Sequence, residues 1–207
     1  MKLLVHILLV MLLVLLNSGC GTVVQRPTLE DFGMIGVIGF DLAEEGRMKV
    51  TTAVPQPSEQ AQEKIQIYQE EAELTREAIG RMSTQSEHTL TLAQLRVVIM
   101  SEAFSRERGI KHVLEYLYRS PIVGDNVLLA VAKGSAEEVI KGRYPNKPIV
   151  TTFLNDLLRP RNVTGFSSFT TLHDFIYTLT DQVSDPTLPY IERIDHTVQI
   201  SKLALFL

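Results

Sequence analysis

Residues 95–140 read LRVVIMSEAFSRERGIKHVLEYLYRSPIVGDNVLLAVAKGSAEEVI, and this stretch decides the fold. Two of its segments, Val97–Met100 and the VLLAVA core of Asn126–Lys133, are apolar at successive positions rather than at alternate ones. A strand carries apolar residues on both of its faces where helices cover both sides of the sheet. Both segments are therefore predicted to be central strands of a covered β-sheet.

Helices are predicted between and after these two strands. Glu102–Arg108 and Gly109–Tyr118 have helical composition and are split near Gly109, and Ser135–Glu138 resembles a capping-box helix start. A succession of strand, helix, strand and helix is typical of parallel crossover units. The stretch thus predicts the α/β class, with a sheet covered by helices.

The chain on either side extends this arrangement. Met34–Phe40 and Arg47–Val54 are β-rich and flank Asp41–Gly46, which has the composition of a hairpin loop, so the sheet should be mixed. A helix is predicted from Ser58 to Met82, because apolar residues recur there at spacings of three and four. Further predicted elements are helices in Pro148–Arg159 and Thr170–Val183 and one closing strand, Ile191–Phe206.

Three glycines, Gly33, Gly36 and Gly39, recur at every third position before the hairpin loop. They match neither the dinucleotide-binding fingerprint nor the phosphate-binding loop of nucleoside triphosphatases. Glycine in a strand usually marks a bulge or a place where another backbone or side chain approaches closely. We therefore expect a packing role for these glycines and no nucleotide site.

The N-terminus has the organisation of a secretion signal. Lys2 precedes an apolar run, Leu3–Leu16, and Asn17–Cys20 reads Asn-Ser-Gly-Cys. About 14 residues of helix reach about 20 Å, which is shorter than the roughly 30 Å hydrocarbon core of a bilayer. We predict an N-terminal lipoprotein signal peptide over residues 1–19, lipidation of Cys20 and a tether over residues 20–31. Plain cleavage and an uncleaved signal anchor are the alternatives.

Charge and cysteine content limit the classes of partner that the protein is expected to have. The formal charge of the chain is −4, and the part that follows the signal carries −5 because Lys2 is lost. A mildly acidic protein is a poor electrostatic match to nucleic acid, so no nucleic-acid partner is expected. The single cysteine has no partner within the chain for a disulfide, which favours its use as a lipid attachment site. Residues 32–207 should form one globular domain.

No catalytic motif is present in the sequence. It contains no HExxH pair, no Cys/His cluster and no G-x-S-x-G nucleophile elbow. Glu102, at the end of a predicted buried strand, is the acid most worth inspecting, although a role at a helix start is the simpler interpretation. We expect no enzyme activity, cofactor or metal. The other candidates are interpreted as structural or solvated: His88, His112, His173, His196, Glu70, Glu71, Glu73 and Glu77.

The segments Val97–Glu102, Gly109–Leu117 and Ala130–Glu138 follow one another as strand, Ser-Glu, Gly-Ile helix, strand and Ala-Lys-Gly-Ser-Ala. This succession resembles the Ger(x)C lipoproteins, the C subunits of nutrient germinant receptors in endospore-forming bacteria. The lipid cysteine, the Gly36–Asp41 hairpin start and the Pro186–Glu192 passage are similar to the same family. The resemblance covers the whole chain beyond the signal peptide.

The resemblance implies a Ger(x)C-like N-terminal α/β domain over residues 32–207. It also implies a non-enzymatic subunit that is lipid-anchored through Cys20 on the outer face of the spore inner membrane. Its partners would be the membrane-embedded A and B germinant receptor subunits. Family members continue into C-terminal domains that this chain lacks, so it resembles a truncated member, and Gly21 stands where the family often has tryptophan.

A second function class stays open, a stand-alone surface lipoprotein that binds a small ligand or a cell-wall component. A deep, polar-lined pocket would favour this alternative, whereas an apolar surface rimmed by charge would favour a receptor subunit. The apolar segment Leu203–Leu207 is also predicted to form a sheet edge that promotes self-association.

Overall fold

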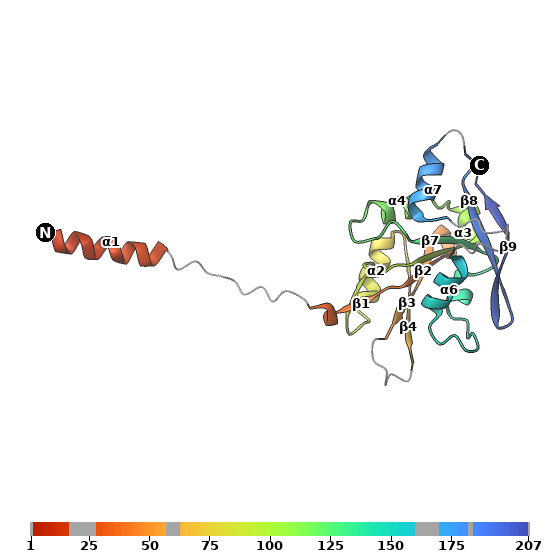
Figure 1. The fold of residues 1–207 in the computed structure, drawn as a ribbon, viewed down its shortest axis with the longest axis horizontal. Helices are drawn as coiled ribbons and strands as arrows, with labels where there is room; N and C mark the ends of the chain where they lie inside the picture. The colour runs from red at the N-terminus through yellow and green to blue at the C-terminus, as the bar shows by residue number, and fades with distance from the viewer. Residues whose placement is uncertain (1, 17–27, 57–62, 160–169, 182–183, 207) are drawn as a thin grey trace.

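The structure is a computed structural model that describes residues 2–16, 28–56, 63–159, 170–181 and 184–206. Within them, one sheet has the strand order β4-β3-β2-β6-β7-β8-β9, and β1 pairs with β5 in a small second sheet (Figure 1). The strands are β1 (Phe32–Met34), β2 (Val37–Leu42), β3 (Met48–Pro55), β4 (Ile65–Ala72), β5 (Thr89–Thr91), β6 (Val97–Ser101), β7 (Leu128–Ala132), β8 (Thr187–Ile194) and β9 (Thr197–Leu205).

The helices lie before, between and after these strands. The α-helices are α1 (Lys2–Leu16), α2 (Thr75–Ser83), α3 (Glu102–Glu107), α4 (Lys111–Arg119), α5 (Ala136–Ile140), α6 (Val150–Leu158) and α7 (Leu172–Thr180), and the 3-10 turns are η1 (Leu29–Asp31) and η2 (Glu44–Gly46). No helix within the described residues is both long enough and apolar enough to cross a membrane.

The centre of the sheet is parallel and buried on both faces. Strand β6 pairs in parallel with β2 and β7, and Val98 lies level with Ile38 and Leu129. Every residue of β6 and β7 is buried. The prediction of two central strands in a mixed sheet covered by helices is confirmed.

Side chains from the central strands alternate between two cores. Val98 and Met100 pack in one core with residues of α2, α3, α4 and α7, whereas Val97 and Ile99 pack in the other with residues of α5 and α6. A strand directs successive side chains to opposite faces, so an unbroken apolar run supplies both cores. Helices cover the sheet on both sides.

The predicted hairpin is present, with β2 and β3 paired antiparallel on either side of η2. Glu45 and Gly46 both have positive φ there, of 56° and 73°. The predicted helix break is also confirmed, because α3 and α4 are separated by Gly109 with a φ of 76°. The helices predicted in 148–159 and 170–183 appear as α6 and α7.

The prediction of one helix from Ser58 to Met82 is wrong where the structure describes it. Ile65–Ala72 is strand β4, and only Thr75–Ser83 is helical. Ile65 and Ile67 contact one core, whereas Tyr68 and Ala72 contact the other. The segment satisfies a strand period as well as a helical one, and its pairing with β3 along eight positions favours the strand. Residues 58–62 lie outside the described residues.

The single closing strand predicted for Ile191–Phe206 is also wrong, because this region is a hairpin. Strand β8 begins at Thr187 and pairs with β9 in antiparallel register on either side of Asp195 and His196. Asp195 has a φ of 49°, a left-handed conformation that reverses the chain direction. Strand β8 also pairs in parallel with β7, which leaves β9 at the edge of the sheet.

Candidate functional site

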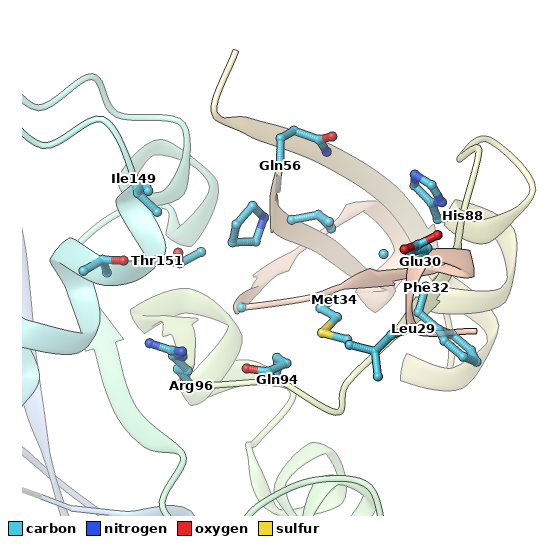
Figure 2. A pocket seen from close by; sticks show the side chains of 15 residues that line it. Leu29, Glu30, Phe32, Met34, Gln56, His88, Gln94, Arg96, Ile149 and Thr151 are labelled. Carbon is cyan, nitrogen blue, oxygen red and sulfur yellow. The ribbon is translucent and has the colours of Figure 1, made fainter. Parts of the chain in front are cut away.

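A groove with a volume of about 610 Å³ lies at the amino-terminal ends of the parallel strands β2 and β6. Met34 lies between its two ends, with Arg96 and Thr151 at one end and Glu30 and His88 at the other (Figure 2). Its walls come from η1 and β1, the end of β3, the segments before β5 and β6, and the start of α6.

Gly36 allows α6 to lie against the start of β2. A Cβ atom at this position would lie 2.9 Å from Thr151 Cγ2, closer than real Cβ contacts allow. The Gly36 carbonyl accepts hydrogen bonds from the backbone N–H groups of Arg96 and Val97, and its own N–H donates to the Ala53 carbonyl. The position thus joins β3, β6 and α6 where they border the groove.

The other two glycines of this series have the same role. A Cβ at Gly33 would lie 2.7 Å from Leu90 Cδ2, and one at Gly39 would lie 2.6 Å from Ile140 Cδ1. The interpretation of these glycines as places of close approach is confirmed. Gly33 and Gly36 also border the groove, which their spacing did not predict.

The groove has an apolar lining with polar groups at its rim. The lining includes Phe32, Met34 and Ile149, and Leu29 is 76% exposed beside them. Arg96 and Glu30 are exposed, and neither side chain has a hydrogen bond or an ion pair with any other described residue. The lining is therefore apolar, with the Arg96 guanidinium at one end and the Glu30 carboxylate at the other.

Glu102, the acid singled out from the sequence, lies at the carboxyl end of β6, which is the end away from the groove. It is the first residue of α3, whose N-cap is Ser101. Its carboxylate accepts hydrogen bonds from the Tyr190 hydroxyl and the Arg106 guanidinium, and these two contacts lower the pKa of Glu102. Burial, together with the bond to Glu102, raises the pKa of Tyr190 to about 12.

The hydrogen bond between the Tyr190 hydroxyl and the Glu102 carboxylate connects β8 to α3. The structural interpretation of Glu102 is supported, with the refinement that Ser101 supplies the cap and Glu102 occupies the first turn.

A third polar cluster surrounds the start of α5, and its central residue, Asp41, was not predicted from the sequence. Asp41 is 7% exposed, and its carboxylate accepts hydrogen bonds from the Ser135 hydroxyl and from the backbone N–H groups of Ala136 and Glu137. The predicted helix start is confirmed, since Ser135 is the N-cap and accepts from the N–H of Glu138. The prediction that Asp41 lies in a hairpin loop is wrong, because it is the last buried residue of β2 and a second cap for α5.

The remaining candidates are dispersed. His88 borders the groove, and His112 lies within α4. His173 contacts Tyr118 with the ring centroids 6.0 Å apart, and His196 lies in the β8–β9 turn. Among the described residues, no three His, Cys, Asp or Glu side chains are arranged to hold a metal ion.

The acidic residues assigned to one solvated helix face belong to different elements. Glu70 and Glu71 lie on β4, Glu73 precedes α2 and Glu77 lies within it. Three of them form ion pairs, with Arg47, Arg108 and Arg81. Cys20, the predicted lipidation site, lies outside the described residues.

The chain matches known proteins over most of its length. A family model described as the spore germination protein N-terminal domain matches residues 25–193. Spore germination protein GerQC from Bacillus cereus is 29% identical over 188 residues, which make up 91% of this chain and 51% of that protein. The crystal structure of the GerBC protein covers 81% of this chain and 47% of its own, with 12% identity and a TM-score of 0.40. The chain spans about half the length of these relatives.

Proposed function

Because the chain belongs to the spore germination protein N-terminal domain family, we propose that it is a non-enzymatic, membrane-anchored subunit of a nutrient germinant receptor. The match of residues 25–193 to that family carries the proposal. In this proposal, residues 1–19 are a signal peptide, a lipid on Cys20 holds the protein on the outer face of the spore inner membrane, and residues 20–31 are the tether. The domain from residue 32 onward contacts the A and B subunits.

The polar clusters support a binding role over a catalytic one. Catalysis requires several groups whose roles interlock, such as a nucleophile with a base and an oxyanion site. The carboxylates of Glu102, Asp41 and Glu137 are instead engaged with neighbouring side chains or helix N–H groups. The groove has an apolar lining with charged side chains at its ends. Such surfaces are typical of contact sites for membranes or proteins.

The alternative of a stand-alone ligand-binding lipoprotein would use the same groove. Its volume of about 610 Å³ lies within the range of small-molecule sites, which is about 300–1,000 Å³. Its exposed apolar rim residue Leu29 and open apolar lining are less suited to holding a small polar ligand in water.

Co-purification from spores tests the proposal. The tagged full chain is expressed during sporulation, the spore inner membrane is solubilised, and bound proteins are identified by mass spectrometry. We expect the A and B subunits to co-purify and the chain to be in the membrane fraction. Recovery of the chain without any other germination protein, from membranes that contain a functional receptor, would overturn the subunit role.

Anchoring has its own measurement. Cells are labelled with an alkyne fatty acid, and the wild-type chain is compared with Cys20→Ala and with the neighbouring control Ser18→Ala. We expect label on the wild type and the control and none on Cys20→Ala. Equal labelling of all three chains would overturn the assignment of Cys20 as the lipid site.

A further inference from the structure

The groove is amphipathic along its length. Phe32, Met34 and Ile149 line it with apolar atoms, and the Arg96 guanidinium lies at one end without a partner among the described residues (Figure 2). The carboxylate of Glu30 lies at the other end and would repel an anion there. A ligand that matches this arrangement carries an apolar chain and a single anionic group, with the anionic group next to Arg96.

The groove also lies at the end of the domain where the chain enters from its N-terminal segment. Leu29 and Glu30 border it, and the described chain resumes at Thr28, eight residues after Cys20. Eight residues reach at most about 27 Å when fully extended. If Cys20 carries the anchor of the proposed function, the groove therefore stays within this reach of the bilayer surface.

We propose that this groove binds an anionic phospholipid of the membrane, with the phosphate on Arg96 and part of an acyl chain against Met34 and Phe32. Arginine pairs with phosphate through several N–H donors at once, which favours it as the headgroup contact. The choice of a membrane lipid as the ligand rests on the proposed function, because it assumes that the domain is held at a membrane. The amphipathic chemistry of the groove does not depend on that function. Bound lipid would hold the domain in one orientation on the membrane.

Photo-crosslinking tests this assignment. The full chain, with p-benzoylphenylalanine in place of Met34, is irradiated in neutral detergent micelles with dihexanoylphosphatidylglycerol or dihexanoylphosphatidylcholine, and intact mass reports the adducts. The matched control carries the same group at Tyr177, which is 66% exposed on α7 outside the groove. We expect a phosphatidylglycerol adduct at position 34, a weaker phosphatidylcholine adduct, and no adduct at position 177.

The variant Arg96→Gln measures how much the Arg96 guanidinium contributes to lipid binding. It should lower the yield of the phosphatidylglycerol adduct about tenfold, because a charge-assisted hydrogen bond is lost. Arg96 is exposed, and its hydrogen bonds to Gly36 and Leu128 use only backbone atoms, so the variant should fold. Its circular dichroism spectrum provides the check. Arg96→Lys keeps the charge but loses the paired N–H donors, so its adduct should lie between those of the wild type and Arg96→Gln. An adduct that is equal at positions 34 and 177, or unchanged in Arg96→Gln, would overturn the proposal.

The same experiment with Cys20→Ala separates this inference from the proposed function. The lipid probe is supplied in solution, so the adduct should be unchanged even when the anchor is lost. A normal adduct together with failure to co-purify with receptor subunits would refute the subunit role alone. In spore membranes, crosslinking from position 34 to another protein rather than to lipid would identify the groove as a protein contact and overturn the lipid assignment.

Discussion

The Asp41 carboxylate accepts a hydrogen bond from the backbone N–H of Ala136, with 2.8 Å between the oxygen and the nitrogen. The two residues are 95 positions apart, and the bond joins the end of β2 to the first residue of α5. Helix N–H groups in the first turn have no partner within the helix, so an acceptor from a distant strand satisfies them and positions the helix at the same time. Asp41 thereby links the antiparallel part of the sheet to the crossover that follows β7.

Asp41→Ala should lower the free energy of unfolding by about 1–3 kcal/mol, because the N–H groups of Ala136 and Glu137 lose their acceptor. Asp125→Ala is the control, since Asp125 is exposed in the loop before β7. Chemical denaturation of both variants measures the difference. Equal midpoints for Asp41→Ala and the control would contradict the proposed stabilising role.

Val98→Asp should lower the free energy of unfolding by about 3 kcal/mol or more, because it places an unpaired carboxylate at a fully buried position of β6. Ile122→Asp introduces the same group at a position that is 52% exposed and should change stability by less than about 0.5 kcal/mol. Thermal unfolding followed by circular dichroism compares them. A wild-type melting temperature for Val98→Asp would disprove the central placement.

Gly36→Ala should destabilise the protein by about 1–3 kcal/mol, since the added methyl group overlaps Thr151 at the start of α6. Gly80→Ala is the matched control. Nothing lies within 4 Å of a Cβ at Gly80, which is within α2, so this change should stabilise by about 0.5–1 kcal/mol. The two alanine substitutions should therefore shift the denaturation midpoint in opposite directions, and shifts of the same sign would be inconsistent with the packing at Gly36.

Acid should remove the stabilisation that Glu137 supplies. Hydrogen bonds from Lys141 and then Lys49 lower the pKa of Glu137 from 4.5 to about 2. A pKa that is lower in the folded protein gives stability that is present above the unfolded value and is lost as the pH falls through the folded value. The stability difference between wild type and Glu137→Gln should be full above about pH 5 and shrink between pH 4.5 and about 2. A stability difference that stays constant from pH 5 down to about pH 2 would rule out the effect.

The free edge of β9 should promote self-association. Leu203 and Leu205 are 45% and 53% exposed on this edge strand, and apolar edges recruit strands from other chains. Replacing both with lysine should lower the apparent mass of the full chain in sedimentation at high concentration. Tyr177→Lys, which adds one positive charge away from the edge, should leave association unchanged. Association that persists in the double variant would locate the contact elsewhere.

The parts of the fold that could be predicted are those where local pattern and tertiary environment agree. The apolar run Val97–Met100, rich in β-branched residues, favours a strand covered on both faces, and Ser135 begins a helix through its own side chain. The hairpin loop over residues 41–46 was recognised from composition, although Asp41 belongs to the strand and acts on a helix 95 residues away. A carboxylate that accepts hydrogen bonds from a helix so far along the chain produces no periodic pattern in the sequence.

The sequence by itself determined the α/β class, the central strands and the family resemblance, because these depend on the order and apolarity of contiguous residues. Tertiary structure alone decided that residues 65–72 are a strand, since their pattern fits two periods and pairing with β3 selects one. It also decided the groove, where Met34, Arg96 and Thr151 come from segments far apart in the chain. Residues separated by more than a helix turn or a strand pair become neighbours only through packing, and contiguous sequence patterns do not encode which of them will meet.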